Sequence, residues 1–207
     1  MSFRSARLMG ARNQLWTGLG QQIPRFARND KAHRLTRNDD APGRLGMTKL
    51  RKLRPSILIG VISDTHGLLR PEALAALRGS EHVIHAGDVG APDILDELSA
   101  IAPVTAVRGN VDKGAWARRL PETEVVELGG ISIYVLHDLA QLDLKPKAAG
   151  FKVVISGHSH VPKQETREGV LYFNPGSAGP RRFRLPVTVG RLIVTAGDLR
   201  GEIVPIL

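Results

Sequence analysis

Short apolar segments recur along the chain at the spacing of a layered α/β fold. The segment 57–62 (ILIGVI) has no polar residue, which is typical of a strand buried on both faces. Between the apolar segments, 71–78 and 92–98 each begin with proline followed by an acidic residue, as helices do. Further predicted strands occupy 83–84, 104–107, 131–136 and 153–155.

The second half of the chain predicts antiparallel strands. Gly129-Gly130, between 124–128 and 131–136, is a strong signal for a two-residue β-hairpin. The remaining predicted elements are a short helix over 142–149, weakened by Pro146, and strands over 163–167, 170–173, 187–195 and 203–206. Together these elements predict an α/β (mixed α+β) fold, in which two mixed sheets pack together between flanking helices.

Composition sets the broad class of the protein. The 207 residues suffice for one domain with a substantial core. Cysteine is absent, which excludes a disulfide framework, thiolate catalysis and a cysteine-bound iron–sulfur cluster. No run approaches the roughly 18 apolar residues of a membrane span, and no signal-peptide pattern is visible. We therefore expect a cytoplasmic protein without a membrane partner.

Positive charge is concentrated at the N-terminus. Residues 1–46 carry nine Lys and Arg against three acidic residues, whereas residues 47–207 carry twenty against seventeen. Because the first segment lacks a sustained hydrophobic period, we predict a disordered basic extension over 1–46 and a folded domain over 47–207. Three interpretations of the extension stay open, in order of preference. It is a segment upstream of a true start at Met47, an organelle transit peptide within the acid-free residues 1–28, or a nucleic-acid-binding arm.

Candidate metal ligands follow five of the predicted strands. They lie just past the strand ends, at the sheet edge where α/β proteins bind ligands. Oxygen and imidazole donors without thiolate suit Mn²⁺, Fe²⁺, Zn²⁺ or Ni²⁺. The set is too large for one tetrahedral ion, but two ions about 3.5–4 Å apart could clamp the attacking and leaving oxygens of a phosphoryl transfer. The candidates are Asp64, His66, Asp88, Asn110, His137, His158 and His160.

Each candidate also has an ordinary structural explanation. Asp64, Asp88 and Asn110 could be turn residues beside glycine or threonine. His137 could be a strand-end histidine with a satisfied hydrogen bond. Independent turns have no reason to occur in this order at successive strand ends, so the combination favours a metal site.

The ordered motifs Asp-x-His, Gly-Asp, Gly-Asn-x-Asp, His and Gly-His-x-His resemble those of calcineurin-like metallophosphoesterases. The SDTHG form of the first motif, Ser63–Gly67, and the NPGS loop, Asn174–Ser177, are similar to the small bacterial and archaeal phosphodiesterase subfamily. The resemblance runs from about Ile57 to the C-terminus and implies a four-layer α-β-β-α sandwich. It also implies one metal held by Asp64, His66 and His160, a second held by Asn110, His137 and His158, and Asp88 bridging them.

The resemblance further implies a two-metal phosphodiesterase acting on a small phosphoester, with a metal-bridging hydroxide as the nucleophile. Bound cations lower the pKa of water towards about 7 and neutralise charge on the phosphoryl oxygens. Asn110 and His137 are the expected catalytic residues, through the metal-bound hydroxide and by positioning the phosphate. Mn²⁺ is the first choice of metal, with Ni²⁺, Fe²⁺, Zn²⁺ and Mg²⁺ as alternatives.

Two positions depart from the family pattern. Val111 occupies a slot where many members carry a histidine that protonates the leaving group or steadies the phosphate. We therefore expect a preference for good leaving groups, and for diesters over monoesters. Asp138 follows His137 where close relatives usually carry glycine, and its carboxylate would repel an anionic substrate unless it points away or is paired.

A substrate contact and an alternative function complete the predictions. Arg181 is a candidate phosphate contact because the guanidinium group matches phosphate geometry, although a solvated loop is the simpler explanation. The family also includes a retromer subunit that works through protein contacts and has lost part of its metal site. A non-catalytic scaffold is therefore the alternative function, and the complete set of candidate ligands favours the enzyme.

Overall fold

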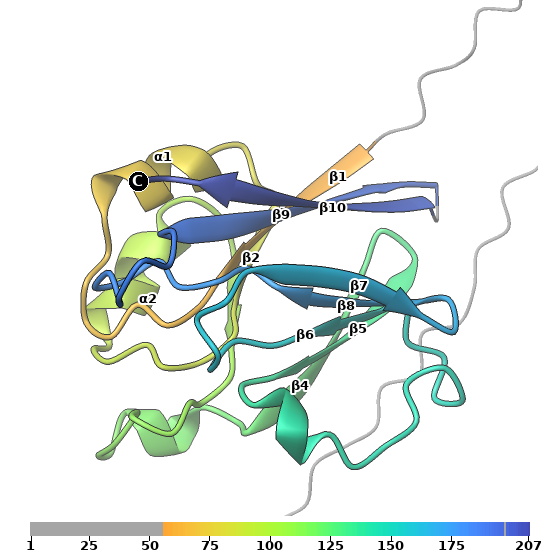
Figure 1. Cartoon of the computed structure of the whole chain (residues 1–207), viewed down its shortest axis with the longest axis horizontal. Helices are drawn as coiled ribbons and strands as arrows, with labels where there is room; N and C mark the ends of the chain where they lie inside the picture. The colour runs from red at the N-terminus through yellow and green to blue at the C-terminus, as the bar shows by residue number, and fades with distance from the viewer. Residues whose placement is uncertain (1–55, 197) are drawn as a thin grey trace, which may run out of the picture. The chain divides into compact units, whose positions relative to one another are not determined.

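The structure, a computed structural model, describes residues 56–196 and 198–207, and the predicted extension over 1–46 lies outside them. The described strands form two five-stranded sheets (Figure 1). Sheet A has the order β10-β9-β1-β2-β3, with β1 (Ser56–Ile62), β2 (His82–His85), β3 (Val104–Ala106), β9 (Thr188–Thr195) and β10 (Asp198–Pro205). Sheet B has the order β4-β5-β6-β8-β7, with β4 (Thr123–Leu128), β5 (Ile131–Leu136), β6 (Val153–Ile155), β7 (Lys163–Arg167) and β8 (Val170–Asn174).

Both sheets are mixed, which confirms the predicted fold class. In sheet A, β1, β2 and β3 are parallel, β9 is antiparallel to β1, and β10 is antiparallel to β9. In sheet B, β5, β6 and β8 are parallel, with β4 and β7 antiparallel at the two edges. Parallel strands end at the same edge of their sheet, so the loops after β1, β2 and β3 meet at one edge of sheet A. The loops after β5 and β6 meet at one edge of sheet B.

The main core lies between the two sheets. Ile59 and Ile84 of sheet A pack with Ile133, Ile155 and Phe173 of sheet B, and none of these side chains is more than 1% exposed. Burying one side chain of this kind contributes about 1.5–3 kcal/mol. The apolar segments seen in the sequence therefore fix the two sheets against each other, and this packing holds the loops at the strand ends.

Two helices cover the outer face of sheet A. These are α1 (Pro71–Leu77) and α2 (Asp93–Ser99), where the proline-led segments predicted them. The helices bury Leu77 and Leu98 against Ile62 of the sheet. Proline stands at the start of α1 because its missing N–H costs nothing in the first turn.

The outer face of sheet B has a different cover. Its buried side chains, among them Tyr134 and Val154, pack under Leu144 and Phe151 from the segment after the 3₁₀ helix η2 (Leu139–Gln141). The helix predicted over 142–149 does not form, and the segment makes only isolated turns such as Phe151 N–H to the Pro146 carbonyl. Pro146 lacks the N–H that an interior helical position needs. The fourth layer of the sandwich is thus a loop with a 3₁₀ turn rather than an α-helix.

The predicted hairpin between β4 and β5 is confirmed. Gly129 and Gly130 both have positive φ, 60° and 79°, as a type I′ turn requires. A second 3₁₀ helix, η1 (Ala117–Arg119), connects β3 to β4. Within residues 56–196 and 198–207, no helix combines the length and the apolar character needed to cross a bilayer.

Candidate metal centre

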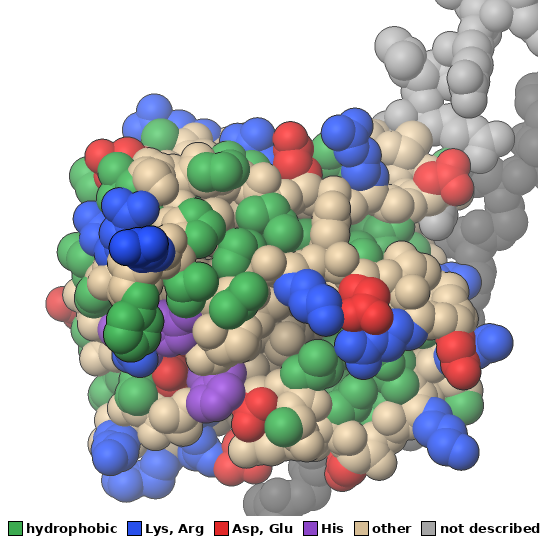
Figure 2. All heavy atoms as spheres, in the orientation of Figure 1, with side chains coloured by type: hydrophobic (Ala, Val, Ile, Leu, Met, Phe, Trp, Pro, Cys, Tyr) green, Lys and Arg blue, Asp and Glu red, His purple; other side chains and the backbone are tan. Residues whose placement is uncertain are grey.

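The seven residues predicted as metal ligands lie in loops that follow the parallel strands of both sheets. The loop after β1 carries Asp64 and His66, and the loop after β2 carries Asp88. Asn110 follows β3, His137 follows β5, and His158 and His160 follow β6. Figure 2 shows histidine side chains at this surface, with a group of Lys and Arg side chains to one side.

One group of donors consists of Asp64, His66 and His160, whose ligand atoms all lie within 4.8 Å of one another. His160 Nε2 is 3.3 Å from Asp64 Oδ1 and 3.2 Å from His66 Nε2. The rings of the two histidines are stacked, with centroids 5.1 Å apart. This is the first of the two ligand sets implied by the resemblance, brought together from two different sheets.

A second group consists of Asp64, Asp88 and His137, again within 4.8 Å. Asp88 Oδ2 lies 3.4 Å from His137 Nε2 and 3.9 Å from His66 Nε2, so this carboxylate stands between the two groups. Asn110 Oδ1 is 3.2 Å from His137 Nε2 and 3.1 Å from His158 Nδ1. Asp64 belongs to both groups in the structure, whereas the resemblance assigned Asp64 to one metal only.

The backbone is strained at most of these residues. Five of the eight non-glycine residues with positive φ in the described chain are candidate ligands: Asp64, His66, Asp88, His158 and His160, at 48–65°. Each left-handed residue of this kind costs about 1–2 kcal/mol. Strain of this sort persists where the surrounding structure imposes it and clusters at functional sites. Here it turns the side chains of successive loops toward one another.

Glycines beside the ligands allow the close approach. A Cβ on Gly109 would lie 2.1 Å from Asp88 Oδ1, and one on Gly157 would lie 2.7 Å from Asp64 Oδ2. A Cβ on Gly87 would lie 2.6 Å from His137 Nδ1. The Gly-Asp, Gly-Asn and Gly-His motifs therefore have a steric basis, since any larger residue would displace a candidate ligand.

The electrostatics of the cluster suit a bound cation. Asp64 is fully buried, its Oδ1 has no hydrogen-bond partner, and burial raises its pKa to about 6. Burial, with the nearby Arg182 guanidinium, lowers the pKa of His160 to about 4, and its Nδ1 also has no partner. A buried carboxylate oxygen without a partner costs free energy unless a charge compensates it. A divalent cation between Asp64 and His160 would provide that charge, so the donor set fits a metal ion.

Hydrogen bonds orient the central pair. His137 Nδ1 lies 2.8 Å from the Ala86 carbonyl and donates to it, which directs Nε2 at Asp88 and Asn110. Burial acts to lower the pKa of His137, but the hydrogen bonds with Asp88 and Ala86 outweigh it and raise the pKa. Burial acts to raise the pKa of Asp88, and the hydrogen bonds from His137 and Val111 N–H lower it instead.

The comparison with known proteins identifies the family of the chain. Residues 57–197 match the family model of the calcineurin-like phosphoesterase superfamily domain. This chain belongs to that superfamily. The resemblance predicted from the motifs is confirmed.

Individual superfamily members are similar over most of the chain. A probable metallophosphoesterase of Methanothermobacter thermautotrophicus is 37% identical over 160 residues, covering 72% of this chain and 92% of that protein. The solved structure of an archaeal phosphodiesterase is 26% identical with a TM-score of 0.60, covering 72% of this chain and 100% of that one. Vps29 of Entamoeba histolytica, complexed with Zn²⁺, shares the fold at 23% identity and a TM-score of 0.57, covering 73% and 100%.

Sequence reasoning missed residues that hold the phosphoesterase loops in place. Buried His85 accepts a hydrogen bond from Gly87 N–H at Nδ1, and its Nε2 lies 2.9 Å from Thr65 Oγ1. Because Nδ1 accepts, the neutral ring carries its proton on Nε2 and donates it to the Thr65 hydroxyl. The Thr65 hydroxyl in turn donates to the Val89 carbonyl. Burial lowers the pKa of His85 to about 3. Its position at the end of an apolar strand gave no signal to separate it from an ordinary core histidine.

Asn174 and Asp112 also hold loops in place. Asn174 Nδ2 donates to the Gly157 carbonyl and to Ser159 Oγ, which ties the His158 loop to the end of β8. The Asp112 carboxylate is 6% exposed and accepts three backbone N–H groups, two of them in the loop that follows Asp88. The NPGS and Gly-Asn-x-Asp motifs were the available signals for these roles.

The two departures from the family motifs are both accounted for. Val111 is 39% exposed, and its N–H donates a hydrogen bond to Asp88 Oδ1 in the cluster. Asp138 caps η2, with Oδ1 accepting the Ala140 N–H, while Oδ2 lies 4.0 Å from His158 Nε2. The added carboxylate is thus paired with the backbone and a histidine at the rim of the site.

The arginine that reaches the cluster is Arg182. Its Nη2 lies 3.4 Å from His66 Nε2. The predicted substrate contact, Arg181, instead donates from Nε to the Leu185 carbonyl at 3.3 Å. Neighbouring arginines in one loop look alike in the sequence, so only the loop conformation distinguishes them.

Proposed function

We propose that the chain is a two-metal phosphodiesterase. Asp64, His66 and His160 would hold one divalent cation, and Asn110, His137 and His158 the other, with Asp88 shared by both. The observation that carries this proposal is the partnerless Oδ1 of fully buried Asp64, which faces two imidazoles at 3.3 and 4.0 Å. Membership of the phosphoesterase superfamily and the similarity to an archaeal phosphodiesterase support it.

When bound, the cations would supply hydroxide at neutral pH by lowering the pKa of water, and would neutralise phosphoryl charge. The chain's own residues position the reactants. His137 is held in the tautomer with Nε2 facing the site by the Ala86 carbonyl, and Asn110 Oδ1 sits between His137 and His158. We assign these two residues, Asn110 and His137, to catalysis through positioning of the nucleophile and phosphate.

Phosphate recognition involves the arginine loop in this proposal. The Arg182 guanidinium lies beside His66, where it can donate to a phosphoryl oxygen. The exposed Arg181 would contribute long-range attraction for an anion from the same loop. Mn²⁺ is the proposed metal, because carboxylate, amide and imidazole donors without thiolate suit it.

The preference for diesters follows from a missing acid. Position 111 holds a valine that is 39% exposed, and its side chain has no titratable group to protonate a departing oxygen. A positioned general acid contributes about 10²–10⁴-fold in rate. Substrates whose departing oxygen is weakly basic should therefore react best, and a monoester dianion would gain little help with a poor leaving group.

The deciding experiment strips the full chain with chelator and reloads it with Mn²⁺. We expect two equivalents of Mn²⁺ to bind and hydrolysis of bis-p-nitrophenyl phosphate to appear, and chelation to abolish it. Parallel loading with Ni²⁺, Fe²⁺, Zn²⁺ and Mg²⁺ ranks the metals. Asp64→Asn should lose metal binding without lowering the melting temperature of the metal-free protein, because the change removes a buried charge. A folded protein that binds no divalent metal would instead favour the scaffold function.

A further inference from the structure

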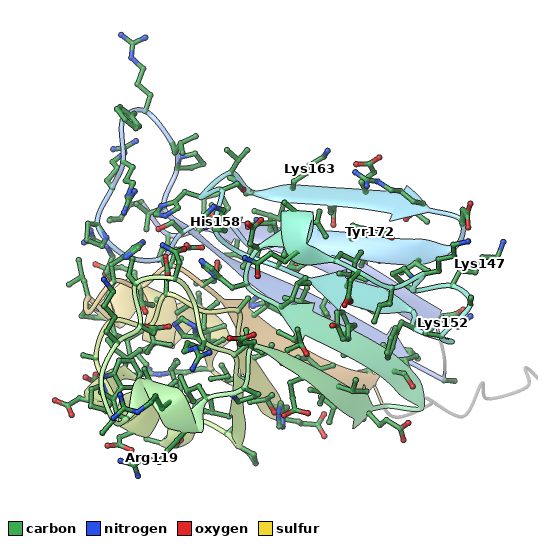
Figure 3. The ribbon with its side chains drawn as sticks, turned by 90° about the horizontal axis from the view of Figure 1, so that it is seen from below. Arg119, Lys147, Lys152, His158, Lys163 and Tyr172 are labelled. Carbon is green, nitrogen blue, oxygen red and sulfur yellow. The ribbon has the colours of Figure 1, made fainter. Side chains whose placement is uncertain are left out.

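A pocket of about 320 Å³ lies beside the candidate metal centre, over the outer face of sheet B. Its walls come from η2, from the loop after β6 and from β7 and β8. Figure 3 shows His158 at one end of this sheet, with Lys163 and Tyr172 on neighbouring strands. The pocket lies on the sheet face that a loop, rather than an α-helix, covers.

The pocket and the metal centre share His158. One nitrogen of this ring, Nδ1, lies 3.1 Å from Asn110 Oδ1 in the cluster. The other, Nε2, lies 4.0 Å from Asp138 Oδ2, and both His158 and Asp138 line the pocket. The pocket therefore begins at a residue of the candidate metal centre.

The charges around the pocket cancel. On β7, Glu165 pairs with Lys163 at 2.9 Å and with Arg167 at 3.0 Å, and hydrogen bonds from these two bases lower its pKa to about 2. Asp138 contributes one more negative charge, so the two basic and two acidic side chains sum to zero. The arginine that contacts the cluster, Arg182, lies at its His66 end instead. This arrangement places phosphate charge at one end and leaves the pocket suited to an uncharged group.

The pocket wall also contains apolar and planar side-chain groups. Tyr172 lines it, and the Arg167 guanidinium lies 4.8 Å from the centre of the Tyr172 ring. Leu139 and Val161 add aliphatic surface, and Val161 is 46% exposed. Flat aromatic and guanidinium groups bind planar rings by stacking.

We propose that this pocket binds a planar, uncharged ring carried by one ester group of the substrate, while the phosphate lies at the metal centre. The proposal rests on the phosphodiesterase function proposed above and narrows its substrates to aromatic or heteroaromatic diesters. A stacked ring should improve affinity by about 5-fold to 150-fold.

The test uses two phosphonates that cannot be hydrolysed, naphthylmethylphosphonate and methylphosphonate, titrated into the Mn²⁺-loaded full chain by calorimetry. Both present the same anionic head, and only one carries a ring. We expect naphthylmethylphosphonate to bind about tenfold more tightly to the wild type. Tyr172→Ala should reduce this ratio toward one, whereas Tyr172→Phe should keep it.

Two valine variants test the same proposal in case the Tyr172→Ala protein does not fold. Val161→Asp places a charge in the pocket and should abolish the ring preference. Val125→Asp is the matched control, because Val125 on edge strand β4 is 47% exposed and lies outside the pocket. Val125→Asp should keep the wild-type ratio of the affinities for the two phosphonates.

The outcomes separate this proposal from the phosphodiesterase function. If both phosphonates bind equally to the wild type, or if the ratio survives Val161→Asp, the pocket is not a ring subsite, although the metal centre stands. If neither phosphonate binds to the metal-loaded chain, the phosphate site itself is wrong and the subsite with it.

Discussion

Gly157→Ala should damage the metal centre from a backbone position that carries no chemistry. Gly157 does not have a left-handed φ, so alanine is compatible with its backbone. The new Cβ would lie 2.7 Å from Asp64 Oδ2, about 0.7 Å short of ordinary contact at 3.4 Å. Asp64 Oδ2 also accepts hydrogen bonds from Ser63 Oγ at 2.7 Å and His158 N–H at 3.2 Å.

The carboxylate is rigid, so pushing Oδ2 away also moves Oδ1, the oxygen that faces His160. Metal sites tolerate ligand displacements of about 0.2 Å. Disturbing the support of a ligand typically weakens metal binding by about 10–100-fold. We expect Gly157→Ala to weaken Mn²⁺ binding about 10–100-fold at one of the two sites, and to lower the rate of hydrolysis in parallel. Crowding of a packed site should also destabilise the metal-free protein by about 1–3 kcal/mol.

The assay is calorimetric titration of chelator-treated protein with Mn²⁺, beside a melting curve without metal. Gly201→Ala is the matched control, because its Cβ would lie 2.8 Å from Gln164 Oε1, a similar crowding away from the site. It should keep both Mn²⁺ affinities. If folded Gly157→Ala binds two Mn²⁺ with wild-type affinities, the reasoning that makes Asp64 a ligand is refuted.

Three further predictions follow from the same structure. Asp88→Asn should reduce Mn²⁺-dependent turnover more than His66→Ala, because Asp88 lies between both donor groups, and a variant with over half the wild-type turnover would contradict the shared role. His85 has a folded-state pKa of about 3 against 6.5, so its contribution to stability is present above pH 6.5 and is lost as the pH falls. In denaturant titrations of metal-free protein, wild type should lose about 2 kcal/mol between pH 8 and pH 5 relative to His85→Gln, and equal losses would contradict this. Val111→His should raise hydrolysis of unactivated diesters more than of nitrophenyl diesters, measured as a flatter dependence of rate on leaving-group pKa. The gain should stay small, because the Asp112 carboxylate is committed to three N–H groups and cannot orient the new ring, and an unchanged slope would show that this position does not serve the leaving group.

The sequence by itself determined the candidate ligands and most of the elements that carry them. Apolar runs marked the strands, and Pro71, Gly129 and Gly130 marked a helix start and a hairpin, because these signals depend on a few neighbouring residues. The candidate ligands could also be predicted from a few neighbouring residues. Each follows its own strand, and parallel strands deliver their ends to one edge whatever the details of packing.

Only the tertiary structure decided what depends on contacts between distant segments. It showed that Arg182, and not Arg181, reaches His66, and that His85 ties two loops together through Thr65. It also showed that a loop covers the outer face of sheet B, which leaves room for the pocket beside His158. Local sequence rules set φ, turns and periodicity. The direction of one side chain among similar neighbours, and the space left between layers, are set by the packing of the whole chain.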